Sequence, residues 1–453
     1  MTFAIKNRAH SSIFIWAAGI FCLSFQVTVL AAIPIQHWTQ PGGAQVYLVE
    51  SPAIAMVDIQ MEFDAGSRRD PAAQAGLAGV TTGMMDKGLL AKGGAPAMDE
   101  NTLSEAWADL GAQFGAGATS DRMSFSLRSL TEPDLLDKAV ALAAREIAEP
   151  AFPDAIWQRE RQRLEASIKE SYTRPGSIIG RAYAQAVYGT HPYGYQVTAE
   201  TLSRISVDDM RKLHAASVVA CRARISMVGA VTRAQADAIV TRLLARLPQV
   251  PCDSLPPLAP VPEVAPLAQA EEKRIPFDSA QAHVIIGQPG FKRDDPDYFP
   301  LIVGNYILGG GGFVSRLTLE VREKRGLTYG VSSYFSPGLH AGAFTVGLQT
   351  RPDQATQAVA LARDVVKDFV ANGPTETELK AAKDNLIGGF ALRIDSNRKL
   401  LDNISGIAWN RLPLDYLDTW TQQVDKVTVA DIKAAFARKL QPEKMVTVVL
   451  GPP

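Results

Sequence analysis

The feature that most constrains this chain is an internal repeat. Residues 206–209 (SVDD) and 428–431 (TVAD) both begin with a hydroxyl residue and have Asp three residues later, which is the pattern of a capped helix start. A second pair of landmarks, residues 69–71 (RDP) and 294–296 (DDP), is separated by nearly the same length of chain as the first pair. Two landmarks with nearly the same offset indicate that one domain is used twice.

A proline-rich segment separates the two halves. Residues 250–272 include six prolines between Pro251 and Pro266, which favours an extended, semi-rigid connector over a helix or an inner strand. We therefore predict an N-terminal domain at 33–249, a linker at 250–272 and a C-terminal domain at 273–453.

Each half combines strand patterns with helix patterns. Alternation of apolar residues, or a run of branched residues, predicts strands at 57–63, 123–127, 224–229, 344–348 and 445–451. Helices are predicted at 102–110, 133–148, 155–170, 354–371 and 375–392, the last of them opened by a capping box. One-sided strands beside clustered helices predict an α+β fold with two homologous halves, each a mostly antiparallel sheet with helices packed on one face.

Residues 1–32 have the pattern of a secretory signal peptide. Lys6 and Arg8 precede an apolar stretch at 13–30, and Ala31 fits a cleavage site. An uncleaved anchor is the alternative. Because no second long apolar run follows, we expect an exported chain that is not held in a membrane after cleavage. Cleavage would leave Cys221 and Cys252, and the sequence does not tell whether these two cysteines pair.

The charge balance bears on the partners. Lys and Arg total 46 and Asp and Glu total 47, which gives a net charge of −1. No net positive field would attract a polyphosphate, so we expect no nucleic-acid partner.

Two segments carry a family resemblance. Residues 63–88 (FDAGSRRDPAAQAGLAGVTTGMMDKG) and 103–130 (LSEAWADLGAQFGAGATSDRMSFSLRSL) resemble the N-terminal domain of the inverzincins, the zinc peptidases of the insulinase and pitrilysin type. The resemblance extends along nearly the whole chain that follows the signal peptide. In active members of this family, the helix that follows the glycine-leucine-alanine turn bears the zinc motif.

The zinc motif itself is degenerate. In active relatives an H-x-x-E-H helix supplies two histidine ligands and a glutamate that polarises the attacking water. The resemblance places Gly79 and Gly83 at the histidine positions, Thr82 at the glutamate position and Ser167 at the third ligand, a glutamate on a later helix. Glycine offers no side chain to a metal, so we expect no metal in this chain.

Other residues give no sign of a metal site. The histidines after the signal peptide are not three or four residues apart, so none forms a helical zinc pair: His37, His191, His214, His283 and His340. A site assembled from distant residues is the alternative. His191 is interpreted as part of a structural loop, and Glu160, Glu165 and Glu170 as solvated helix charges.

The C-terminal half carries a second motif. Arg322 and Tyr329 resemble the family's Arg and Tyr, seven residues apart, that project toward the zinc. The resemblance implies that they hold the peptide carbonyl and stabilise the oxyanion. The alternatives are an arginine that pairs with a nearby acid and a core tyrosine.

A glycine run precedes the Arg and Tyr pair. The resemblance makes its members weaker candidates for substrate binding: Gly309, Gly310, Gly311 and Gly312. A flexible linker and a phosphate cradle are the alternatives, and the cradle is disfavoured because no lysine follows with P-loop spacing.

These residues together predict a chain that cannot cut a peptide bond alone. The hypothesis is a non-catalytic, substrate-binding subunit of a heterodimeric zinc metallopeptidase, which acts on peptides or unfolded chains. Zinc is expected in a homologous partner subunit that bears H-x-x-E-H. A bacterial periplasm is expected, because family pairs of this kind occur there. The alternatives are a structural scaffold derived from a peptidase, with no proteolytic role, and an autonomous enzyme with an unrecognised site.

Overall fold

The protein contains two main β-sheets, which have the same order of five strands, and the first sheet has β1 as an additional edge strand. The computed structural model describes residues 33–452, so the predicted signal peptide lies outside the described residues. The first sheet has the order β1-β2-β8-β3-β7-β6 and the second has β9-β13-β10-β12-β11. In each sheet one pair of described strands is parallel, β2 with β8 and β9 with β13, and the other described pairs are antiparallel.

The strands have the following bounds. Those of the N-terminal half are β1 Gln36–Thr39, β2 Gln45–Glu50, β3 Met56–Phe63, β4 Gly88–Leu89, β5 Met98–Asp99, β6 Gln113–Ala118, β7 Met123–Leu130 and β8 Arg224–Gly229. Those of the C-terminal half are β9 Glu271–Pro276, β10 Ala282–Pro289, β11 Gly330–Phe335, β12 Ala343–Thr350 and β13 Val446–Gly451. β9 begins at Glu271, so the last two residues of the segment predicted as a linker belong to a strand.

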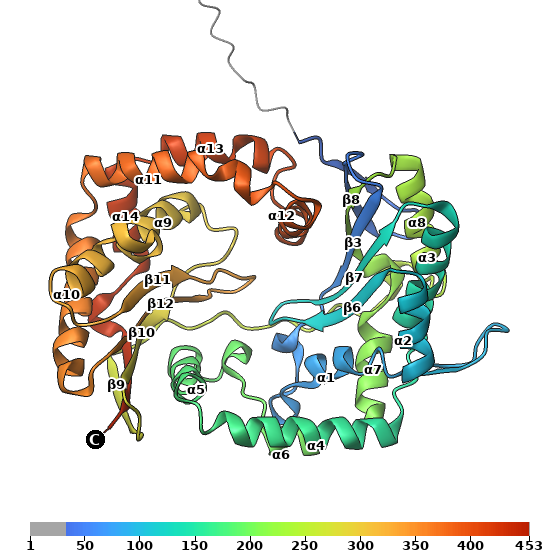
Figure 1. Cartoon of the computed structure of the whole chain (residues 1–453), viewed down its shortest axis with the longest axis horizontal. Coiled ribbons are helices and arrows are strands. Elements are labelled where there is room, and N and C mark those ends of the chain that lie inside the picture. Colours follow the sequence, from blue (N-terminus) through green and yellow to red (C-terminus); the bar gives the residue numbers. More distant parts are fainter. Residues whose placement is uncertain (1–32, 453) are drawn as a thin grey trace, which may run out of the picture. The chain divides into compact units, whose positions relative to one another are not determined.

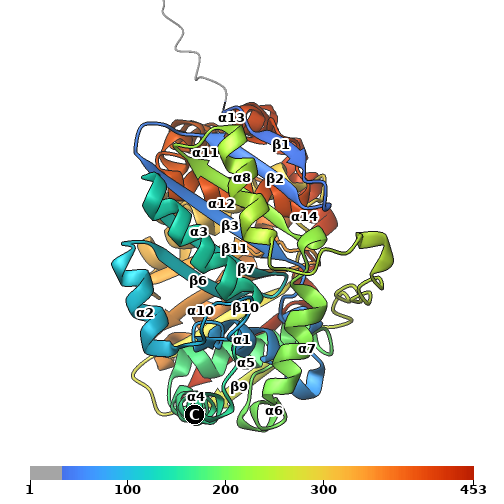
Figure 2. The ribbon, with the colours of Figure 1, turned by 90° about the vertical axis from the view of Figure 1, so that its right-hand side faces the viewer.

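Helices of the same half cover one face of each sheet. Those of the N-terminal half are α1 Leu77–Gly83, α2 Glu100–Asp109, α3 Pro133–Ala148, α4 Asp154–Ser171, α5 Pro175–Tyr188, α6 Ala199–Ser203, α7 Val207–Ser217 and α8 Arg233–Leu244. Those of the C-terminal half are α9 Tyr298–Asn305, α10 Ala355–Asn372, α11 Glu376–Gly388, α12 Asn397–Asn410, α13 Tyr416–Lys426 and α14 Val429–Lys439. Figure 2 shows α3 and α8 in front of the first sheet, and Figure 1 shows α10 beside the second. The predicted α+β class with two homologous halves is confirmed.

Helix α7 and helix α14 begin at the capping residues that the sequence predicts. The Ser206 and Thr428 side chains accept hydrogen bonds from the backbone N–H of Asp209 and Asp431, which closes the predicted capping boxes of α7 and α14. The helix predicted at 375–392 ends earlier: α11 stops at Gly388 and a separate 3₁₀ turn follows at Phe390–Arg393. Two consecutive glycines, Gly388 and Gly389, weaken the helix at this point.

Each half contributes one helix to the sheet of the other half. α5 packs against β10 and β13, where Ile179, Tyr183 and Val187 are buried, and α12 packs against β8 and β3 (Figure 1). The Tyr183 hydroxyl donates a hydrogen bond to the Phe344 carbonyl at 2.9 Å. The first residues of α5 and α12 are separated by the same length of chain as the two capping-box residues, so the exchanged helices are equivalent members of the repeat.

A disulfide ties the proline-rich segment to the N-terminal half. Cys221 and Cys252 are bonded, with 5.6 Å between their Cα atoms, which answers a question that the sequence left open. Next to it, the Arg222 guanidinium donates a hydrogen bond to the Pro256 carbonyl at 2.6 Å. The start of the connector is therefore fixed to the body of the first half.

Removal of this disulfide is expected to destabilise the chain. The bond spans 31 residues, and the chain-entropy model assigns a loop of this size about 3.5 kcal/mol of the free energy of unfolding. Urea unfolding of the Cys221→Ala/Cys252→Ala variant should show a loss close to this amount. Reductant should lower the stability of the native chain and leave the variant unchanged. An equal effect of reductant on both proteins would contradict a role for the disulfide.

Glu146 is a buried acid whose titration should make the free energy of unfolding depend on pH. It is 2% exposed in α3 and accepts a hydrogen bond from Trp107 Nε1 at 2.7 Å. Burial raises the pKa of Glu146 to about 7. Because folding raises this pKa, the neutral carboxyl group makes its full contribution to the free energy of unfolding below the pKa that Glu146 has in the unfolded chain. This contribution is lost as pH rises through about 7.

The Glu146→Gln variant tests this titration, because glutamine keeps the acceptor for Trp107 and has no charge. We expect the free energy of unfolding of the native chain, relative to this variant, to fall between pH 5 and pH 8 by up to about 3 kcal/mol. Urea unfolding across that range measures it. The matched control is Glu105→Gln on the exposed side of α2, and parallel profiles for native and Glu146→Gln protein would contradict the prediction.

Candidate functional site

Three of the four positions of the degenerate zinc motif line a cavity between α1 and α4. Gly79 and Gly83 of α1 and Ser167 of α4 all line this cavity of about 370 Å³. The walls are mainly apolar and include Val80, Met84, Trp157, Leu164, Ile168 and Leu202. Thr82, the fourth motif position, is not in the lining. It is buried, and its hydroxyl donates a hydrogen bond to the Gly79 carbonyl of its own helix at 2.9 Å.

The two glycines of this cavity are not required by the packing. A Cβ atom built on Gly79 or on Gly83 meets nothing within 4 Å. Glycine inside a helix costs about 0.5–1 kcal/mol relative to alanine, so neither position gains stability from glycine. Larger side chains at both positions would extend into the cavity.

The residues present do not fit a zinc ion. Gly79 and Gly83 supply no donor atom, and Ser167 supplies only a hydroxyl, whereas zinc in proteins is held by thiolate, imidazole or carboxylate. Across residues 33–452, no cluster of three or more His, Cys, Asp or Glu is arranged to hold a metal ion.

Glu160 is a cavity residue that was interpreted from sequence as a solvated helix charge, and that interpretation is wrong. Its side chain is 13% exposed, lines the cavity and lies 2.8 Å from Arg163 and 3.0 Å from Arg159. Burial raises the pKa of Glu160, but the hydrogen bonds from Arg163 and Arg159 outweigh burial and lower it. The carboxylate is therefore ionised, and the two arginines compensate its charge. Its spacing of seven residues from Ser167, two turns along one face of α4, is the signal that could have placed it here.

Arg322 and Tyr329 lie in the C-terminal half, and Tyr329 directly precedes β11. Arg322 belongs to a π-helical segment, Thr318–Glu323, and its guanidinium lies 4.6 Å from the centre of the Phe313 ring and 3.3 Å from the Glu323 carboxylate. Tyr329 is 86% exposed, so the alternative of a core tyrosine is wrong. The ion pair with Glu323 agrees with the alternative in which Arg322 pairs with a nearby acid. Since Arg322 is partly exposed, this pair leaves the guanidinium accessible to a ligand.

The glycine run is packed and is not a flexible linker. A Cβ atom on Gly309 would lie 2.4 Å from Ser333 Oγ, and one on Gly311 would lie 2.7 Å from the Tyr306 carbonyl oxygen. Gly310 is also crowded, at 2.9 Å from Asn305 Nδ2, and Gly312 has a φ of +62°. The close packing holds the next residue, Phe313, in an exposed position beneath Arg322. The run therefore ends beside the ring that Arg322 contacts.

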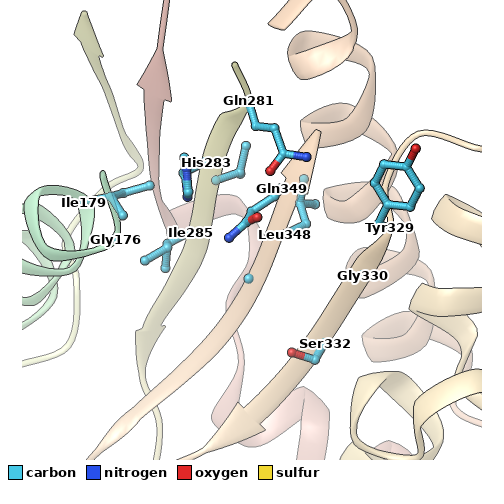
Figure 3. Close-up of a pocket in the computed structure, with 12 residues that line it drawn as sticks. Gly176, Ile179, Gln281, His283, Ile285, Tyr329, Gly330, Ser332, Leu348 and Gln349 are labelled. Atoms are coloured by element: carbon cyan, nitrogen blue, oxygen red, sulfur yellow. The ribbon is translucent and has the colours of Figure 1, made fainter. Parts of the chain in front are cut away.

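Tyr329 also borders a concave surface on the second sheet. This cavity of about 470 Å³ is lined by β10, β11 and β12 and by Gly176 and Ile179 of α5. Figure 3 shows Tyr329 on one side, the α5 residues on the other, and Gln281 and Gln349 between them. Phenol and amide groups beside strands suit hydrogen bonding to an extended peptide. Gln281 and Gln349 were not predicted. Gln281 directly precedes β10 and Gln349 lies in β12, and the pairing of these two strands brings them together.

Comparison with known proteins gives consistent matches along the chain. Residues 45–201 match the family model described as "Insulinase (Peptidase family M16)", and residues 204–386 match "Peptidase M16 inactive domain". An uncharacterized zinc protease of Streptomyces coelicolor is 25% identical over 427 residues, which cover 92% of this chain and 90% of that protein. The non-peptidase homolog YmxG of Helicobacter pylori is 25% identical over 424 residues, 91% and 92% of the two chains.

Solved structures share this fold. The peptidase M16 inactive domain from Pseudomonas fluorescens has a TM-score of 0.86 and 35% identity, and the match covers 93% of this chain and 98% of that one. The periplasmic protease PqqL from Escherichia coli has a TM-score of 0.77 and 18% identity, and the match covers 94% of this chain and 46% of that one.

Proposed function

The chain belongs to peptidase family M16, and from this premise we propose that it is the substrate-binding, non-catalytic subunit of a two-chain zinc peptidase. One observation carries the proposal. Both histidine positions of the zinc motif are glycine, while Arg322 and Tyr329 of the C-terminal half are accessible to a ligand. A chain built in this way can bind a peptide and cannot activate water with a metal.

In the proposed complex a homologous partner that bears H-x-x-E-H holds the zinc. When bound to that partner, zinc would supply an activated water and would polarise the peptide carbonyl. Arg322 donates hydrogen bonds to the oxyanion that forms, because a guanidinium is a permanent cation with a fixed set of donors. The Tyr329 phenol adds a further donor. Such groups act most strongly where they are already in place before charge develops.

The substrates are proposed to be peptides or unfolded chains. The concave surface beside Tyr329 offers amide groups from Gln281 and Gln349 and lies along strands of the second sheet. A folded substrate would present few free backbone groups to such a surface, whereas an extended peptide presents one donor and one acceptor per residue.

We propose export to the periplasm. The disulfide between Cys221 and Cys252 is a bond that persists in oxidising compartments. PqqL, one of the structures with this fold, is described as a periplasmic protease. Within residues 33–452, no helix has both the length and the apolar character needed to span a bilayer.

A structural scaffold without a proteolytic role is the second candidate. Phe313 and Val314 are 68% and 74% exposed and adjacent in the chain. Exposed large apolar side chains of this kind are common in protein interfaces. The scaffold hypothesis also predicts assembly with a partner and differs in predicting no gain of activity.

The deciding experiment uses the purified chain, a homologue from the same genome that bears H-x-x-E-H, and their mixture. Peptide hydrolysis and bound zinc are measured in each sample. We expect activity in the mixture alone, with the zinc in the homologue. A mixture that forms a complex but is no more active than the homologue would favour the scaffold. Zinc binding and cleavage by this chain alone would overturn the proposal.

A further inference from the structure

Three arginines from the two halves meet in one pocket, which we name the arginine pocket. It has a volume of about 250 Å³ and is lined by Arg224, Arg293 and Arg411, with Trp409 beside them. Arg224 is the first residue of β8 in the N-terminal half. The other two arginines belong to the C-terminal half, where Arg293 follows β10 and Arg411 follows α12. The tertiary structure therefore concentrates positive charge between segments that are far apart in sequence.

These arginines have few protein partners. Among residues 33–452, neither Arg224 nor Arg411 forms an ion pair, and the polar contact of the Arg293 side chain is a hydrogen bond donated to the Tyr416 hydroxyl at 2.7 Å. Burial and the nearby charge of Arg411 lower the pKa of Arg224. The charges of Asp64 and Glu62 act in the opposite direction, but burial and the repulsion between the cations outweigh them. Binding of an anion would relieve this repulsion.

Aromatic rings contact the planes of two of the three guanidinium groups. The Arg224 guanidinium lies 4.9 Å from the centre of the Trp409 ring, and that of Arg293 lies 3.8 Å from the centre of the Tyr298 ring. Stacking of this kind satisfies the face of a guanidinium. The N–H groups along its edge stay available, and their fork matches carboxylate and phosphate oxygens.

Two further observations at the pocket point to a ligand. Arg411 has a φ of 53°, a left-handed conformation that favours glycine, so an arginine there costs stability. Trp409 is 4% exposed, and its Nε1 has no hydrogen-bond acceptor within the described part of the chain. A strained arginine and an unpartnered donor at one pocket are of the kind found at binding sites.

The pocket also contains two carboxylates. Asp64 is already paired with Arg68 at 2.6 Å and with Arg69 at 2.7 Å, so its charge is compensated. Asp294 is exposed and forms no ion pair with another described residue. Asp294 should therefore oppose an anion in the pocket, and its removal should strengthen binding.

We propose that the arginine pocket binds an oxyanion, either a carboxylate or a phosphate group, which would join the two halves through Arg224 and Arg411. The proposal does not depend on the peptidase hypothesis, because it concerns charge and geometry in this chain alone. The carboxylate at the end of a peptide and free inorganic phosphate share this chemistry, and the experiment separates them.

The probe is inorganic phosphate, titrated into the full chain at constant ionic strength and followed by calorimetry and by the thermal midpoint. We expect saturable binding and a midpoint that rises with phosphate, because a ligand that binds only the folded state stabilises it. A short peptide with a free C-terminal carboxylate and the same peptide with a C-terminal amide form the second arm. Competition with phosphate by the free acid and not by the amide identifies a peptide terminus as a source of the group.

Four variants test the geometry. Arg224→Gln and Arg411→Lys should each weaken phosphate binding about tenfold, which corresponds to about 1.4 kcal/mol. Arg411→Lys keeps a cation at the end of α12 and removes the fork, so it separates a ligand role from an interaction with the helix dipole. Arg411→Gly should weaken binding while it raises the thermal midpoint of the phosphate-free chain. Asp294→Asn should tighten binding.

The matched control is Arg233→Gln. Arg233 also lies over an aromatic ring, Trp38 at 5.0 Å, and lies outside the pocket. It should leave phosphate binding unchanged. Absence of saturable binding, or equal weakening in Arg233→Gln and Arg411→Lys, would overturn the proposal, because either result would mean general screening of positive charge.

Discussion

Peptide turnover by the assembled two-chain complex is expected to fall about 100- to 1,000-fold when Arg322 is replaced by alanine, because one oxyanion donor is removed. Arg322 has only one ion pair among the described residues, with Glu323 at 3.3 Å, and its side chain is 35% exposed. The loss should appear in kcat, since the oxyanion exists in the transition state and not in the bound peptide. Zinc content and subunit association should not change.

The Tyr329→Phe variant gives a finer measurement, because it removes one hydroxyl from a side chain that is 86% exposed. Turnover should fall in the same direction and the stability of the chain should not change. The matched control is Arg325→Ala, three residues from Arg322, whose guanidinium is held by Glu320 at 2.6 Å. Equal losses in Arg322→Ala and Arg325→Ala, or no loss in either, would exclude the proposed role.

A zinc site should appear in this chain when its missing ligands are supplied. The variant Gly79→His/Gly83→His/Ser167→Glu places two imidazoles and a carboxylate around a cavity of about 370 Å³. The cavity has room for them, because a Cβ atom at either glycine meets nothing within 4 Å. We expect about one zinc per chain after dialysis, measured by atomic absorption, against none in the native protein.

Two companion variants make this experiment decisive. Gly79→Ala/Gly83→Ala should bind no zinc and should raise the free energy of unfolding by about 0.5–1 kcal/mol per site. Arg163 lines the same cavity and repels a divalent cation, so adding Arg163→Gln to the histidine variant should tighten zinc binding. A folded histidine variant that holds no zinc would mean that Ser167 is not at the third-ligand position.

Much of the fold could be predicted from local pattern. The offset between residues 206–209 and 428–431 also relates the first residue of α3 to that of α10, and the first residue of β8 to that of β13. Helix α3 has the predicted bounds, Pro133–Ala148, because proline opens it and apolar residues recur at helical spacing. Strands β6 and β11 were not predicted, since β6 (QFGAGA) consists largely of glycine and alanine and carries little strand signal.

The candidate site was predicted in part. Gly79, Gly83 and Ser167 could be related only through a family resemblance, and the structure places them in one cavity. Glu160 was assigned to solvent, because a charged residue in a polar helix usually faces water and its spacing of seven residues from Ser167 was not considered. The exposure of Tyr329 could not be predicted either, since a single tyrosine between a helix and a strand fits a core as well as a surface.

The sequence alone determined that one α+β domain occurs twice, and that two positions of the zinc motif have no side chain. Both properties can be predicted from residues close together in sequence, because helix caps, hydrophobic periodicity and side-chain identity act within one turn or one strand. Only the tertiary structure decided that α5 and α12 cover each other's sheets, that Cys221 bonds Cys252, and that three arginines share a pocket. The physical reason is that the sequence shows which helix faces must be buried and which charges must be compensated. Which residues bury or compensate them depends on how segments distant in sequence pack together.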